Sequence, residues 1–198
     1  FRQGFTLADS LSDLIRLAKT NLADHFRFEY VSRADTIGTD AQPYTEGCRV
    51  KFAIFIGVSP KGSLQVDLAV SAGVTGAVKT TEPMTALDLP RLISHPYRLY
   101  PVADQIADKV CATMAEYGER ASSREKDLVD LVVLAATHDV DGTALCAAIA
   151  AESRRRKMPP FEHFVVPSSW GDGYSRLSKP VPHCNAHSNV ELASALVA

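Results

Sequence analysis

Residues 49–70 read RVKFAIFIGVSPKGSLQVDLAV, two extended apolar runs on either side of a turn-rich segment, VSPKGS. The second run places apolar side chains at every other position, namely Leu64, Val66, Leu68 and Val70. Alternation with a period of two is typical of a β-strand with one buried face. The stretch therefore predicts a β-hairpin, and with it a sheet that is at least partly antiparallel.

The sequence before the hairpin predicts one helix and one further strand. Residues 6–22 have helical spacing of their apolar side chains, which are Leu7, Leu11, Leu14, Ile15 and Leu17. Asp9 and Ser10 are candidates for capping the start of this helix. Residues 26–31, FRFEYV, alternate again and predict a strand.

After the hairpin the apolar period changes from two to 3.6. Helices are expected over residues 102–117, 122–137 and 142–157. The chain thus predicts an α+β protein, with a sheet domain over residues 1–98 and a helical C-terminal lobe over residues 99–198. In the tail, Trp170 is expected to anchor the chain by packing.

Composition restricts the class of protein. The chain has 198 residues, of which 46% are hydrophobic and 22% charged, as in an ordinary globular protein. Its formal net charge of −2 gives no overall positive field that would indicate nucleic-acid binding, so any contact with nucleic acid must be local. Its longest apolar runs are far shorter than the ~20 residues of a membrane span. The four cysteines form no Cys-x-x-Cys pair, which favours reduced thiols. These features predict a cytoplasmic protein without a membrane partner.

Two charged residues fall on or beside apolar helix faces. In the helix that begins near Val102, Lys109 lies at the edge of the apolar arc, while Asp104 and Asp108 are expected to point to water. In the next helix, which a Ser122–Glu125 capping box is expected to start, Asp127 lies inside the apolar arc.

A carboxylate on an apolar face needs a partner, because burying it unpaired costs several kcal/mol. Lys109 is the nearest cation to Asp127 in the sequence. The pair has two interpretations: a functional cleft, or a structural ion pair between helices, with Asp127 favoured near a helix N-terminus by the dipole.

Asp67 is the third notable residue, because aspartate is disfavoured inside strands. It could bind Mg²⁺, which prefers hard oxygen ligands and is usually held by one or two carboxylates together with substrate phosphates. Alternatively, it belongs to the solvated outer face of the hairpin.

The segments YPVADQIADKVCA (100–112) and KDLVDLVVLA (126–135), with Arg120 and Arg124 between them, resemble the AbiEii-type nucleotidyltransferases of toxin–antitoxin systems. This family includes the mycobacterial MenT toxins, and in it an iADKl.A helix precedes a KDxyDL helix. The upstream segments NLADHFRFEY, GCRVKFAIFIG and LQVDLAV are also similar to the family. The resemblance extends over residues 21–135.

The resemblance implies a DNA polymerase β-like nucleotidyltransferase fold with a helical C-terminal lobe. It implies an Mg²⁺-dependent toxin that transfers nucleotides from an NTP to the 3′ end of tRNA, blocks translation and has a cognate antitoxin. By position, Lys109 matches the lysine that contacts the triphosphate, Asp127 the acidic residue of the last motif, and Asp67 a metal-binding carboxylate. Arg120 and Arg124 are the candidates for further contacts with the NTP.

One family motif, a Gly-Ser turn followed by Asp-x-Asp, does not occur in the sequence. We expect it to precede Phe1, with the sheet domain lacking its N-terminal part. Two other functions stay open: a catalytically degenerate module that engages an antitoxin or RNA, and a nucleotidyltransferase with a protein or small-molecule acceptor. The basic run Arg154–Lys157 either grips an RNA backbone or interacts with the dipole at a helix end.

Overall fold

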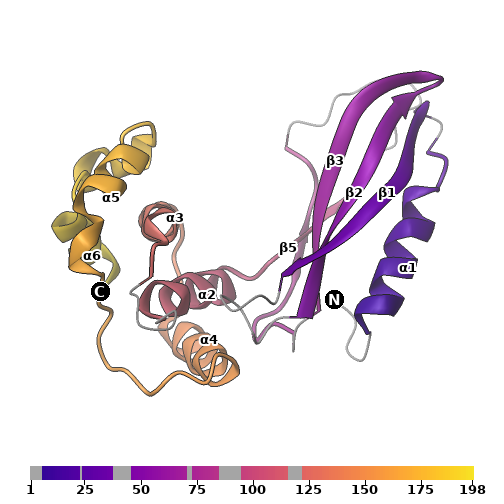
Figure 1. Ribbon diagram of the computed structural model, residues 1–198. Coiled ribbons are helices and arrows are strands. Elements are labelled where there is room, and N and C mark those ends of the chain that lie inside the picture. Colours follow the sequence, from indigo (N-terminus) through magenta and orange to yellow (C-terminus); the bar gives the residue numbers. More distant parts are fainter. Residues whose placement is uncertain (1–5, 23, 38–45, 71–72, 85–94, 116–121) are drawn as a thin grey trace. The chain divides into compact units, whose positions relative to one another are not determined.

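The computed structural model describes residues 6–22, 24–37, 46–70, 73–84, 95–115 and 122–198 (Figure 1). The chain divides into two compact units. The first comprises Phe1–Gly73 and Thr80–Tyr97, and the second Val74–Lys79 and Arg98–Ala198. Sheet lies mainly in the first unit and helix in the second, which confirms the predicted α+β class.

The first unit contains a three-stranded antiparallel sheet in the order β1-β2-β3. Its strands are β1 (Phe26–Ile37), β2 (Glu46–Ile56) and β3 (Ser59–Val70). The predicted hairpin is confirmed, because β2 and β3 pair along their whole length. Gly57 opens the turn between them with a φ of 57°, a left-handed conformation that glycine adopts without steric cost.

Helix α1 (Leu7–Ala18) packs on one face of this sheet, as Figure 1 shows. The core between them contains Leu7 and the buried sheet residues Cys48, Val50 and Phe52. Of the two predicted capping residues, Asp9 takes part in a capping box whose N-cap is Thr6: the Thr6 hydroxyl accepts a hydrogen bond from the Asp9 amide at 3.1 Å. Asp9 lies inside the helix and accepts the Thr6 amide in return.

The second unit is built from helices (Figure 1). The three predicted helices are confirmed with shorter ends, as α2 (Val102–Met114), α3 (Glu125–Thr137) and α4 (Gly142–Arg155). The tail adds η1 (Ser168–Trp170), α5 (Gly171–Ser178), η2 (Pro182–His187) and α6 (Val190–Val197). Two short strands, β4 (Lys79–Thr81) and β5 (Tyr97–Leu99), pair where the units meet in the sequence. In the part of the chain that the structure describes, no helix is long and apolar enough to cross a membrane.

The predicted capping box at the start of α3 is not formed. The helix begins at Glu125 with Arg124 as its N-cap, and the Ser122 hydroxyl instead donates to the carbonyl of Ala112 in α2. The Ser122 carbonyl accepts a hydrogen bond of 2.7 Å from the indole of Trp170. Trp170 is buried against α3, so the prediction that it anchors the tail is confirmed.

Asp104 does not point to water, contrary to the helical projection. Its side chain is buried and accepts three hydrogen bonds: 2.8 Å from the Thr75 amide, 2.8 Å from the Thr75 hydroxyl and 2.9 Å from the Gly76 amide. These bonds satisfy the buried carboxylate and fasten the segment before β4 to α2. The projection missed them because it treats a helix without its neighbours.

We predict that Gly76→Ala destabilises the protein. A Cβ atom at this position would lie 2.8 Å from Cβ of Pro101 and 3.1 Å from Oδ2 of Asp104, so the segment must move and strain its hydrogen bonds. We expect the free energy of unfolding to fall by about 1–3 kcal/mol, as for other overpacked sites. Urea denaturation measures this change.

Gly142→Ala is the matched control. Gly142 is the first residue of α4, and an added Cβ there meets no atom within 4 Å. Its stability should be unchanged or slightly higher, because alanine favours a helix. Equal stability of the two variants would contradict a close approach at Gly76.

Candidate functional site

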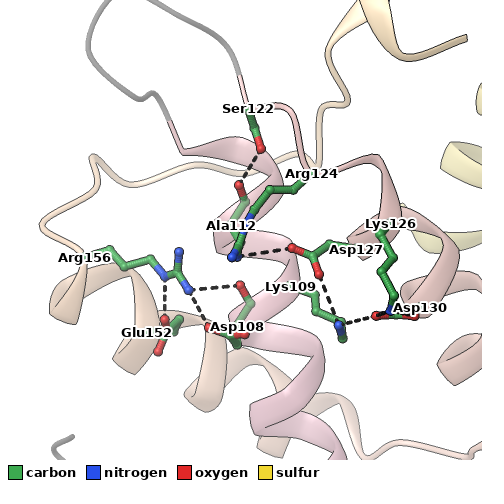
Figure 2. A network of polar contacts seen from close by, with 10 residues as sticks. All are labelled: Asp108, Lys109, Ala112, Ser122, Arg124, Lys126, Asp127, Asp130, Glu152 and Arg156. Atoms are coloured by element: carbon green, nitrogen blue, oxygen red, sulfur yellow. Dashed lines mark hydrogen bonds and ion pairs between the residues drawn. The ribbon is translucent and has the colours of Figure 1, made fainter. Parts of the chain in front are cut away.

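The centre of the candidate site is the side chain of Lys109, which reaches from α2 to two carboxylates of α3 (Figure 2). Its Nζ lies 3.2 Å from Oδ1 of Asp127 and 2.6 Å from Oδ2 of Asp130. Lys109 and Asp127 thus lie together, as their positions on the two helix faces indicate. Their roles in chemistry stay predictions.

Two further cations of the α3 N-terminus extend this cluster. Arg124 contacts Asp127 at 3.4 Å, and the Lys126 ammonium contacts Asp130 at 2.8 Å from the preceding turn of the same helix. Positive and negative groups therefore alternate from Lys126 through Asp130, Lys109 and Asp127 to Arg124, and Figure 2 shows the alternation. This arrangement offsets the charge of every member.

The members of the cluster differ in how far their side chains are exposed to water. The side chains of Lys109 and Asp127 are 13% and 17% exposed, whereas that of Lys126 is 74% exposed. A partly buried ammonium acts in a medium of lower dielectric than water, where its field is stronger. The low exposure of Lys109 therefore strengthens its interactions with Asp127 and Asp130, which offset its charge.

The surroundings keep Lys109 and Asp130 charged. Burial acts to lower the pKa of Lys109, but the hydrogen bond to Asp130 and the nearby negative charges outweigh it and raise this pKa above 10.5. For Asp130, burial acts to raise the pKa, yet hydrogen bonds from Lys109 and Lys126 hold it below 3.8. At neutral pH both groups are therefore ionised.

Asp130 is the member that the sequence analysis missed. It lies three residues after Asp127 and four after Lys126, spacings at which helical side chains are neighbours. It is also the second aspartate of the KDLVDL segment, so the signal was present. Of the two arginines predicted to contact NTP, Arg124 lies beside Asp127, whereas Arg120 is outside the described residues.

Asp67, the candidate metal ligand, belongs to the first unit, whereas Lys109 belongs to the second. It lies on β3, on the sheet face opposite the one that α1 covers, because Val66 and Leu68 pack towards α1. Its carboxylate accepts two hydrogen bonds, of 2.6 and 2.9 Å, from the guanidinium of Arg49 on β2. Both side chains are half exposed, as expected for a solvated outer face.

No metal-binding cluster accompanies Asp67. Within the residues that the structure describes, no group of three or more His, Cys, Asp or Glu side chains could hold a metal ion. The guanidinium of Arg49 instead holds the pKa of Asp67 below its usual range, mainly through the hydrogen bond. Asp67 is therefore ionised and has oxygen atoms of the kind that Mg²⁺ prefers.

The basic run Arg154–Lys157 includes the last two residues of α4, and its members differ in exposure and in partners. Arg156 is buried, and its guanidinium bonds to Asp108 on α2 and to Glu152 on α4 (Figure 2). Arg155 is paired with Glu152 as well. The Asp108 side chain is 44% exposed, as predicted for a residue that points to water, and it also has a protein partner. Of the run, only Arg154 and Lys157 are fully on the surface.

Comparison with known proteins gives one family. The model described as "Nucleotidyl transferase AbiEii toxin, Type IV TA system" matches residues 5–189, which include both units. The chain belongs to this family of toxins. No curated protein matches the chain. A toxin of this class has an antitoxin partner, and the family name indicates nucleotidyl transfer.

We predict that Asp130→Asn weakens the acid dependence of stability. A carboxylate whose pKa is lower in the folded state stabilises it above the unfolded-state pKa, and this contribution is lost as pH falls through the folded-state value. Between about pH 5 and about pH 2, the free energy of unfolding should fall less in the variant than in the wild type. Urea titrations at several pH values measure this, and an equal fall would contradict the ion pairing of Asp130.

Proposed function

We propose that this AbiEii-family chain is an Mg²⁺-dependent nucleotidyltransferase that adds nucleotides from an NTP to the 3′ end of tRNA and so blocks translation. Its site of action would be the cytoplasm, where tRNA is charged. The proposal depends on one observation above all: a partly buried lysine, held between two carboxylates, at the position where the family's triphosphate-binding lysine is expected.

Lys109 supplies the positive charge. Nucleotidyl transfer builds up negative charge on the phosphate oxygens, and catalysis comes mostly from positioning and electrostatic stabilisation. An ammonium fixed at 13% exposure needs little reorganisation when the triphosphate arrives. Arg124, 38% exposed at the N-terminus of α3, is placed to add a second cation.

In this proposal Asp127 orients the attacking 3′-hydroxyl group by accepting its hydrogen bond. Its contacts to Lys109 and Arg124, at 3.2 and 3.4 Å, are longer than typical charge-assisted hydrogen bonds. The carboxylate can therefore take a further donor without breaking a short bond.

Asp67 is the residue that would hold Mg²⁺, together with the phosphates of the NTP. Its donor chemistry fits the ion, and its ion pair with Arg49 is exposed, so exchanging the guanidinium for a metal costs little. When bound, Mg²⁺ offsets the charge on the transferred phosphate and aligns it with the attacking hydroxyl.

A second function is favoured by the internal charge balance. Lys109 is already paired with Asp127 and Asp130, and Asp67 with Arg49, as in structural ion pairs. These pairs would suit a catalytically degenerate member that engages an antitoxin or RNA. A nucleotidyltransferase with a protein or small-molecule acceptor would use the same charges, so the acceptor has to be tested directly.

We predict that Lys109→Ala and Asp127→Ala, each in the full-length chain, largely abolish incorporation of labelled NTP into tRNA. Loss of electrostatic stabilisation in a preorganised site typically reduces kcat by a factor of about 10²–10³. Both variants should also relieve growth inhibition in a host cell. The measurement is labelling of total tRNA with each of the four NTPs.

Asp13→Ala is the control, because Asp13 forms an exposed ion pair with Arg16 on α1 and lies outside the candidate site. Its labelling should equal that of the wild type. If the wild type labels no RNA with any NTP, a binding function replaces the enzyme; if it labels a protein or small molecule, only the acceptor is wrong.

We further predict that Arg154→Gln with Lys157→Gln weakens tRNA binding without removing chemistry at saturating tRNA. These exposed cations are placed to contact phosphates, and such contacts make affinity depend on salt. The slope of log Kd against log salt concentration should be smaller in the double variant. An unchanged slope would assign these residues to the dipole of the α4 C-terminus.

A further inference from the structure

The carboxylate closest to Lys109 is that of Asp130, to which neither the sequence analysis nor the proposed mechanism gives a role. The ammonium lies 2.6 Å from Asp130 and 3.2 Å from Asp127. A charge-assisted hydrogen bond of about 2.7–2.9 Å is already strong, so the bond to Asp130 is the dominant one.

Asp130 is itself held in place by Lys126. The Lys126 ammonium donates to both carboxylate oxygens, at 2.9 and 2.8 Å, and lies one turn earlier on α3. Lys126 is 74% exposed, so this i,i+4 pair helps to orient the carboxylate, and the contact of 2.6 Å to Lys109 is the shortest in the cluster. Asp127 has the longer contact to Arg124, at 3.4 Å.

The two carboxylate contacts also restrict the side chain of Lys109. The contacts to Asp130 and Asp127 engage N–H donors of the Lys109 ammonium and fix the end of its stem. A flexible lysine stem that is already fixed loses less freedom when it binds a phosphate oxygen.

We propose that Asp130 is a positioning residue, which holds Lys109 in the orientation that receives the NTP triphosphate. The inference rests on the proposed function, because it concerns how the same lysine binds NTP. Asp130 does not touch the substrate and acts through Lys109. The competing interpretation is that Asp130 only fastens α2 to α3.

A purely electrostatic effect of Asp130 on NTP affinity would have the opposite sign to a positioning effect. Replacing Asp130 by asparagine removes a negative charge beside the NTP site, and without a positioning effect this change strengthens the binding of an anionic ligand. If Asp130 positions Lys109, the same substitution weakens NTP binding. The sign of the change in affinity therefore separates the two interpretations.

The experiment uses Asp130→Asn in the full-length chain. The Kd for an NTP analogue with a non-hydrolysable α,β bond is measured in the presence of Mg²⁺, and KM and kcat for NTP are measured by tRNA labelling. We expect Kd and KM to rise about tenfold or more, as for the loss of other groups that orient a binding residue, with a smaller change in kcat. Asp13→Asn makes the same charge change in an exposed ion pair and should bind like the wild type.

A thermodynamic cycle with Lys109→Met tests whether Asp130 acts through Lys109. In the Lys109→Met background, Asp130→Asn should cause no further rise in Kd, because the residue to be positioned is gone. Asp130→Glu keeps the charge and should recover part of the affinity. It also allows the test to proceed if Asp130→Asn does not fold, since its Kd should then lie above that of the wild type.

Each outcome has one meaning. Unchanged or tighter binding by folded Asp130→Asn overturns the inference and leaves the proposed function standing. An equal rise in Kd in the wild-type and Lys109→Met backgrounds also overturns it, in favour of a structural role. Failure of the wild-type chain to bind any NTP analogue overturns the proposed function, and the inference with it.

Discussion

A partly buried lysine ammonium between two carboxylates is the interaction on which the proposed chemistry of the helical unit depends. Removing charges from water is costly, and a pair at this depth is weak evidence of net stability, because apolar side chains of similar size often serve as well. The ion pairs do require a fixed relation between α2 and α3. We therefore interpret Lys109, Asp127 and Asp130 as a device for placing charge rather than for holding the fold.

Periodicity in the sequence correctly predicted the main helices and strands, but not the residues at which they begin and end. Alternation over residues 64–70 and helical spacing over residues 7–17 reflect one buried face each, and both elements are present. The capping box predicted at Ser122 failed because tertiary structure brings a backbone carbonyl near its hydroxyl, whereas the box of Thr6 and Asp9 is local to α1. Ser122 fits a capping box in the sequence, but its hydroxyl donates a hydrogen bond to the Ala112 carbonyl. Thr6 is the N-cap of α1.

The sequence predicted only those features of the candidate site that follow from the geometry of a single helix. Helical phase placed Lys109 and Asp127, but a projection of single helices cannot show that Asp130 is nearer to Lys109. For Asp67, counting back from the turn pair Ile56–Ser59 puts Cys48 opposite it. A register shift between Ile54 and Phe55 moves the pairing by one residue, so that Arg49 becomes its partner. Sequence alone does not specify such a bulge.

The two charged sites differ in how readily they can exchange partners. The ion pair of Asp67 and Arg49 is half exposed and screened by water, so a metal ion can replace the guanidinium with little loss of stability. Lys109 is shielded, and if it moved, its carboxylate partners would lose their most buried cation and keep only the more exposed Arg124 and Lys126. In the proposed reaction the triphosphate would therefore be received by a lysine that stays in place, and Asp67 would hold Mg²⁺ in exchange for its exposed contact with Arg49.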